Sequence, residues 1–176
     1  MKVNIKMNRF ATIEEVQRLN KVTYYTIEFE DKDESEFENF VSKYENDSTI
    51  KDEYNDLISW IAKIGNEIGA KSQYFRPEIK AHALPPPKKI TNIVYVKNLR
   101  LYCMWISESI IILFNGAIKT QNTAQACPNV KPHFDLANKL VLEIEKLMRG
   151  QHKAIIEDKK NQKLIIDEGT LGTVKK

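Results

Sequence analysis

Three apolar segments separated by very short breaks lie in residues 92–121. Val, Ile, Tyr, Phe and Trp are frequent there, as expected for strands with a pleated, half-buried surface. Lys97-Asn98 and Ser107-Glu108 are the two breaks, and asparagine tolerates the positive φ that tight hairpin turns need. The sequence therefore predicts a three-stranded antiparallel meander at the centre of the fold.

The length of each turn determines which side chains share a face of this meander. If both turns have two residues, Ile106 pairs with Ser109 and Arg100 lies opposite Asn115. One face is then hydrocarbon and is expected to carry helices: Val94, Val96, Leu99, Leu101, Cys103, Trp105, Ile110, Ile112 and Phe114. The other face is apolar at one end and cationic and aromatic at the other: Ile93, Tyr95, Arg100, Tyr102, Met104, Ile111, Leu113, Asn115, Ala117 and Lys119. A three-residue second turn would break this alignment.

Helical periodicity occurs on both sides of the meander. Helices are predicted over 35–44 and over 50–68, where apolar residues recur at helical spacing and Gly69 is placed to end the second helix. A third helix is predicted from Pro132 to Gly150. These three helices are expected to supply the apolar faces that cover the sheet.

Two other segments are assigned from local patterns. Residues 23–30 alternate as in a strand, whereas 71–90 contain Pro77 and three consecutive prolines and are expected to form a loop. Thr12 and Glu15 have the spacing of a capping box, so the N-terminal residues form either a short helix or an ordered arm.

The residues after Gly150 are rich in Lys, Glu and Asp, with two short apolar groups. This tail is expected to be partly disordered. The alternative is that residues 164–166 add a strand to a sheet edge or dock a partner.

Composition limits the classes of protein to consider. A chain of 176 residues with 42% hydrophobic and 29% charged residues is typical of a soluble globular domain. It has no apolar run long enough to span a membrane, and its N-terminus has no signal-peptide core, so we expect a cytoplasmic protein with no membrane partner. Two cysteines and three dispersed histidines predict no metal site, and the absence of a glycine-rich phosphate loop predicts no nucleotide cofactor.

The net charge of +3 permits a nucleic-acid partner without requiring one. Its distribution is more informative, because acidic residues dominate 28–56 whereas cations gather in the meander and the segment before it. These cations are Lys71, Arg76, Lys80, Lys88, Lys89, Lys97, Arg100 and Lys119.

The order of strand, two helices, loop, meander and helix resembles the RelE/ParE superfamily of bacterial toxins, and within it the HigB-like, phage-derived branch. The resemblance covers roughly residues 23–148. It is carried by Ala83-Leu84-Pro85, Leu99-Arg100-Leu101-Tyr102, the strand from Ser109 to Asn115, and Gly116-Ala117-Ile118-Lys119-Thr120-Gln121. It implies an α+β fold, with a small curved antiparallel and partly mixed sheet, two N-terminal helices packed on it and a C-terminal helix. The implied domains are an arm at 1–22, the toxin domain at 23–150 and a charged tail at 151–176.

The same resemblance implies a function. The chain would be the toxin of a type II toxin–antitoxin pair, neutralised by a cognate antitoxin protein, and would cleave mRNA on the ribosome. The ribose 2′-hydroxyl attacks the adjacent phosphate in this reaction, without a metal or cofactor. Such chemistry needs a base, an acid and cations that stabilise the charge of the phosphorane.

The resemblance also assigns catalytic residues. Arg100 matches the strand arginine that binds the scissile phosphate, and its planar fork suits two phosphate oxygens. Lys119 matches the cation at the end of the last strand. Tyr102 and Tyr95 are candidates to stack a base. His82 is the candidate for proton transfer, because its loop is expected to cross the mouth of the sheet.

Further RNA-binding candidates are Arg76, Lys80, Lys88, Lys89, Asn115 and Gln121. Thr120-Gln121 stands where many members carry Lys-Arg or a His, Tyr or Asp, which leaves the general acid unassigned. The alternative function is a non-catalytic module of the same fold that acts through a protein partner. Arg100 and Tyr102 would then be ordinary exposed strand residues, and the loop cations a solvated surface.

Overall fold

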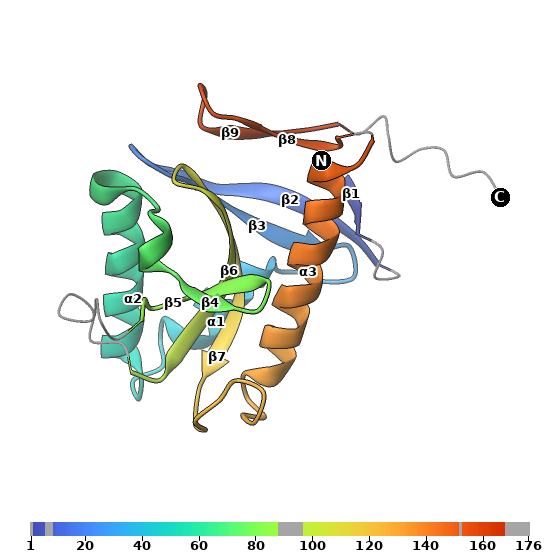
Figure 1. Cartoon of the computed structure of the whole chain (residues 1–176). Coiled ribbons are helices and arrows are strands. Elements are labelled where there is room, and N and C mark those ends of the chain that lie inside the picture. The colour runs from blue at the N-terminus through green and yellow to red at the C-terminus, as the bar shows by residue number, and fades with distance from the viewer. Residues whose placement is uncertain (1, 6–8, 88–96, 152, 168–176) are drawn as a thin grey trace.

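A seven-stranded mixed sheet organises the computed structural model, with the strand order β1-β2-β3-β7-β6-β5-β4 (Figure 1). The structure describes residues 2–5, 9–87, 97–151 and 153–167. The second and third strands of the predicted meander are present as the hairpin of β6 (Leu99–Ser107) and β7 (Ile110–Ile118). β7 also pairs in parallel with β3 (Thr23–Phe29), which makes the sheet mixed. The α+β class is thus confirmed, whereas the expected first strand of the meander, at 92–96, lies outside the described residues.

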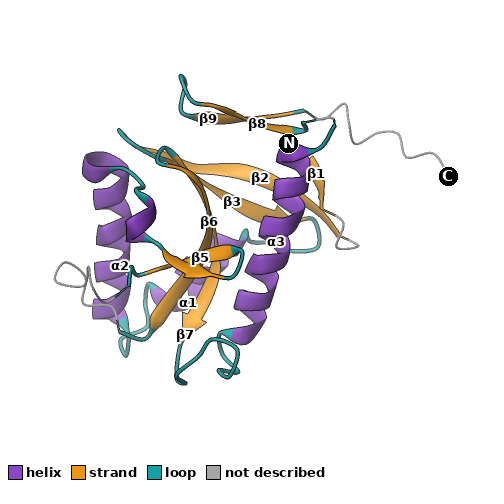
Figure 2. Ribbon diagram, viewed as in Figure 1, coloured by secondary structure: helices purple, strands orange, loops and turns teal. Residues whose placement is uncertain are grey.

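The three predicted helices are present and lie on both sides of the sheet (Figure 2). They are α1 (Glu36–Tyr44), α2 (Lys51–Lys63) and α3 (Lys131–Arg149). Ser35 caps α1 with a complete capping box. α2 continues into one π-helical turn, η1 (Ile64–Ile68), and Gly69 ends it with a φ of 75°. A left-handed φ of this kind is where glycine is favoured after a helix.

Two apolar cores result, one on each face of the sheet. α1 and α2 pack against Leu101 and Ile111. α3 packs against Tyr102 and Ile112 on the opposite face. Neighbouring residues of β6 and β7 therefore belong to different cores, as the alternation of side chains along a strand requires.

The predicted register of β7 is wrong, by one residue opposite Cys103–Trp105 and by two residues at both ends of the ladder. Ser107 pairs with Ile110, so the turn residues are Glu108-Ser109, and the β6–β7 ladder contains two irregularities. Arg100 consequently lies opposite Ala117 and not Asn115. A shift of one residue moves every side chain of the strand to the other face. The predicted faces are therefore correct for β6, whereas Ile110, Ile112 and Phe114 of β7 face α3, and Ile111 and Leu113 face α1 and α2.

The N-terminal residues form strands and not a helix. β1 (Lys2–Ile5) pairs with β2 (Arg9–Arg18), and β2 pairs with β3. The Thr12–Glu15 spacing belongs to β2, where Thr12 lies opposite Glu28 and Glu15 opposite Tyr25. Pairing with β3 has therefore overridden the local capping signal.

Residues 71–90 also contain more structure than predicted. A short 3-10 turn, η2 (Ser72–Tyr74), precedes a hairpin of β4 (Arg76–Glu78) and β5 (Ala81–Leu84) that extends the sheet beyond β6. Pro77 is tolerated because β4 is the edge strand, where a missing N–H does not interrupt a ladder.

The tail contains a second small sheet, contrary to the expected disorder. β8 (Ile155–Asp158) and β9 (Lys163–Ile166) form an antiparallel hairpin. The hairpin packs on the main sheet, where the Leu164 N–H donates to the Tyr25 hydroxyl at 2.9 Å and the Thr23 hydroxyl donates to the carbonyl of Gln162 at 2.7 Å. Among the described residues, none of the helices is long and apolar enough to cross a membrane.

Candidate functional site

Two arginines from separate strands and the lysine that follows β7 gather on the face of the sheet that α3 covers. Arg100 lies on β6 opposite Ala117, a residue of the core beneath α3. Arg76 lies on β4 opposite Ala83, which is also part of that core. Lys119 follows β7 directly, and its N–H donates to the carbonyl of Asn98 at 2.8 Å. We call Arg76, Arg100 and Lys119 the basic cluster.

The members of the basic cluster influence one another electrostatically. Burial, and then the charge of Arg76, lower the pKa of Arg100. Burial, and then the charges of Arg100 and Arg76, lower the pKa of Lys119. Glu78 of β4 lies among these cations; burial raises its pKa, and the three cations oppose that shift. The Glu53 carboxylate also acts on Arg100, so three cations face two carboxylates. A net positive charge remains, which an anion such as a phosphate would relieve.

Arg100 is held in place by a turn that α2 organises. Its side chain is only 8% exposed, and Nη1 donates to the carbonyls of Lys97 at 3.1 Å and Leu99 at 2.8 Å. The Glu53 carboxylate of α2 accepts the N–H groups of Lys97, Asn98 and Leu99 at 3.1, 2.8 and 3.0 Å. Glu53 therefore positions the turn that positions Arg100. The sequence showed Glu53 only as one of several acidic residues.

Arg76 retains hydrogen-bonding capacity within the basic cluster. Its Nη2 donates to the carbonyl of Pro86 at 3.3 Å. Its Nε is buried and has no hydrogen-bond partner among the described residues. An unused buried donor on a guanidinium is a group that an incoming anion can satisfy.

Tyr102 lies beside the basic cluster but is fully buried. Its ring meets the ring of Phe134 on α3 edge to face, with centroids 6.0 Å apart. Burial raises the pKa of its hydroxyl. A ring covered in this way does not offer a face for base stacking in this conformation. Tyr95, the other stacking candidate, lies outside the described residues.

The structure does not bring His82 together with Arg100. His82 lies on β5 between Ala83 and Ala81, which belong to the core beneath α3, so its side chain points to the other face. Its Nδ1 is buried without a partner among the described residues, and burial lowers the pKa of the imidazole. His82 therefore lies on the face of α1 and α2, away from the basic cluster.

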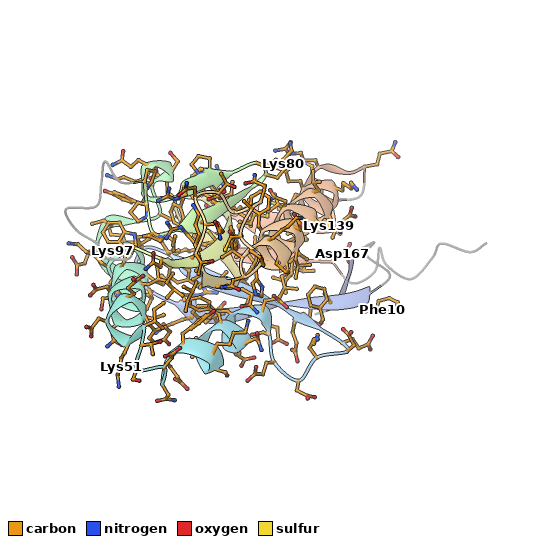
Figure 3. All side chains as sticks on the ribbon, turned by 90° about the horizontal axis from the view of Figure 1, so that it is seen from below. Phe10, Lys51, Lys80, Lys97, Lys139 and Asp167 are labelled. Carbon is orange, nitrogen blue, oxygen red and sulfur yellow. The ribbon has the colours of Figure 1, made fainter. Side chains whose placement is uncertain are left out.

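The remaining candidates are dispersed. The Asn115 side chain faces α1, where Oδ1 accepts from Lys43 at 3.2 Å and Nδ2 donates to Asn39 at 2.9 Å. Lys80 is exposed at the tip of the β4–β5 hairpin (Figure 3), and Gln121 is exposed after β7. Lys88 and Lys89 lie outside the described residues.

Cys127 lies close to the basic cluster and was not predicted as a site residue. The thiol is buried, and it accepts the Thr120 N–H at 3.3 Å. Burial by itself would raise the pKa of this thiol, but hydrogen bonds from Thr120 and from the N–H groups of Val130 and Asn129 lower the pKa to about 6. A single cysteine in a polar loop carries no sequence signal for such an environment.

The described part of the chain holds no group of three or more His, Cys, Asp or Glu side chains that could bind a metal ion. No protein-family model, no curated protein and no solved structure matches this chain. The interpretation of the site therefore depends on its own geometry and charge.

Proposed function

We propose that the basic cluster binds the phosphate backbone of RNA and that the protein is a toxin of the RelE/ParE type. The observation that carries the proposal is the convergence of Arg76, Arg100 and Lys119, from separate elements, on one end of one sheet face. The order from β3 through two helices, a set of strands and α3 also supports it. In this proposal the partners are mRNA, the ribosome and a cognate antitoxin, all in the cytoplasm.

Each cation has a distinct role in the proposed cleavage of mRNA. Lys119 and Arg76 are less buried than Arg100 and are the first to meet the RNA backbone. Arg100, fixed by its own turn, holds the scissile phosphate while the ribose 2′-hydroxyl attacks it. The phosphorane carries more negative charge than the phosphate, so a preorganised cation lowers the barrier.

A second candidate function is a binding module of the same fold without catalysis. The position of His82 favours it, because the proton-transfer group expected beside Arg100 lies on the opposite face. The burial of Tyr102 favours it as well. In this alternative the basic cluster binds an acidic partner and no bond is cleaved.

Induced expression in a bacterial host tests the nuclease proposal. Wild type is compared with Arg100→Ala and Lys119→Ala, with growth and mRNA 5′ ends measured together. Lys51→Ala, an exposed cation at the start of α2, is the matched control. We expect growth arrest with 5′ ends at fixed codon positions in wild type and control, relieved by either cluster substitution at equal soluble protein. Normal growth and intact mRNA from soluble wild type would exclude the nuclease and favour the binding module.

A further inference from the structure

The tip of the β4–β5 hairpin holds an isoleucine in a backbone conformation that isoleucine rarely adopts. Ile79 and Lys80 are the two turn residues, because Glu78 pairs with Ala81. Among the described residues other than glycine, only Ile79, with a φ of 65°, and Gln162 have a positive φ. A positive φ at the first of two turn residues is the pattern of a type II′ turn, where glycine is usual. A β-branched residue in this conformation is strained.

Packing in the core does not explain this strain. The side chain of Ile79 is 75% exposed, which is the highest value among the large exposed hydrophobic residues that the structure describes. Burial of an isoleucine can offset a strained backbone through apolar contacts, but an exposed isoleucine gains little from them. Strain of this kind is concentrated at binding sites, where the surrounding structure fixes it. Ile79 is therefore a candidate contact residue for a ligand.

Helix α3 fixes the strained turn. Asn138 Oδ1 accepts the N–H groups of Lys80 at 2.7 Å and Ala81 at 2.9 Å. Asn138 Nδ2 donates to the carbonyl of Phe134 at 2.9 Å, so the orientation of the amide is determined on both sides. The tip is thus preorganised on the α3 side of the sheet, which is the face that carries the basic cluster.

The hairpin connects this tip directly to the basic cluster. Arg76 precedes Ile79 by three residues, a separation of roughly 10 Å along an extended strand. The Glu78 carboxylate, between them in the sequence, lies among the cations of the cluster. A nucleotide next to one whose phosphate lies on Arg76 can therefore reach Ile79.

The charge around the tip suits a nucleic acid. Lys80 at the tip and Lys139, which follows Asn138 on α3, are both exposed (Figure 3). The carboxylates on the same part of α3 form ion pairs with lysines of that helix: Asp135 with Lys131, and Glu143 with Lys146. Exposed cations beside an exposed apolar side chain match a ligand that carries phosphates and flat apolar surfaces together.

We propose that Ile79 contacts the face of an RNA base next to the phosphate that the basic cluster binds. Every base has such a face, so the contact adds affinity without reading a particular sequence. The cations hold the backbone, and Ile79 excludes water from an unstacked base. This inference rests on the proposed function, because it assumes that the basic cluster binds RNA.

Binding of a short single-stranded RNA with 2-aminopurine at each position in turn tests the contact. This base fluoresces more strongly when it leaves its stacked neighbours, so we expect a rise with wild type at one position and none with Ile79→Gly. Anisotropy should show roughly tenfold weaker binding by Ile79→Gly, the scale for losing a buried isoleucine side chain. The slope of log K against log salt should equal that of wild type, since no phosphate contact is lost.

Further variants separate the contact from the stability of the turn. Glycine suits the positive φ, so Tm of Ile79→Gly should not fall. Ile79→Asn, which also tolerates this φ, should weaken binding in the same way, whereas Ile79→Leu keeps the apolar surface and should bind as wild type does. Ile165→Ala is the matched control, because it removes a 48% exposed isoleucine from the separate β8–β9 sheet and should leave RNA binding unchanged.

The outcomes distinguish this inference from the proposed function. If wild type binds RNA with a salt slope that Arg76→Gln reduces, but Ile79→Gly binds equally well, only the base contact is overturned, and a protein contact at the tip is favoured. An equal rise of 2-aminopurine fluorescence in wild type and Ile79→Gly would also overturn the base contact alone. Failure of wild type to bind RNA would overturn both the base contact and the proposed function.

Discussion

Gly116 of β7 approaches the backbone of β6 so closely that no side chain fits between them. A Cβ at this position would lie 1.8 Å from the carbonyl oxygen of Arg100 and 2.9 Å from the Cα of Leu101. These are backbone atoms of a central strand, so they cannot move aside as the end of a flexible side chain can. Overpacking a core costs roughly 1–3 kcal/mol, and we expect Gly116→Ala to reduce the free energy of unfolding by about 3 kcal/mol.

Urea unfolding followed by circular dichroism measures this loss. Gly116→Ala should lower the midpoint at unchanged m-value, and should lower Tm by about 6–12 °C, since each kcal/mol corresponds to about 2–4 °C in a chain of this size. Gly150→Ala is the control, because its φ of −62° suits alanine, and its effect should stay within about 0.5 kcal/mol. A loss below about 1 kcal/mol for Gly116→Ala would refute the close approach of the two strands.

Three further substitutions test other parts of the structure. Glu53→Ala removes the carboxylate that accepts three backbone N–H groups, and it should lower the free energy of unfolding by about 2 kcal/mol. Amide hydrogen exchange at Leu99 should become faster, and unchanged exchange would contradict the role of Glu53 in holding this turn. Burial, and then the charge of Lys43, lower the pKa of His133 from its ordinary 6.5 to about 4. The unfolded chain therefore binds the proton more tightly than the folded chain, and the free energy of unfolding should fall as the pH decreases from about 6.5 to 4. His133→Asn should remove that part of the slope in urea unfolding across this pH range, and an unaltered slope would refute it. Tyr24→Phe removes the buried hydroxyl that donates to the carbonyl of Ile61 at 2.8 Å and should cost about 1 kcal/mol by thermal unfolding; no loss would show the bond to be unimportant.

The elements with strong local signals were predictable from the sequence. Helical spacing located α1, α2 and α3, Ser35 marked the start of α1, and Gly69 located the end of the second helix. The alternation of β6 was also correct, because it depends on side chains within one strand. These features are determined by neighbours in the sequence.

Features that depend on distant partners were not predictable in the same way. The β7 register depends on which residues form a tight turn, and Ser107-Glu108 and Glu108-Ser109 are equally polar. β2 and β4 exist because another strand pairs with them. The β8–β9 hairpin is ordered by contacts with β3, such as the bond between Leu164 and Tyr25, which its charged sequence does not reveal.

The candidate site was predictable in part. Arg100, Lys119 and Arg76 were chosen from the sequence, and the structure places them together. His82 was assigned to a loop, but β5 gives it a defined face on the other side of the sheet. Glu53 lies far from Arg100 in the sequence, so only the fold shows that it fixes the turn beside that arginine.

The most direct test of the central claim is the salt dependence of RNA binding. A short, fluorescently labelled single-stranded RNA is titrated with wild type, Arg76→Gln, Lys119→Gln and the control Lys51→Gln, and anisotropy is measured over a range of salt concentrations. Each phosphate contact of a single strand contributes about 0.7 to the slope of log K against log salt. We expect each cluster variant to bind more weakly and to lose about 0.7 of slope, with Lys51→Gln equal to wild type. Equal slopes in all four proteins would contradict an RNA site at the basic cluster.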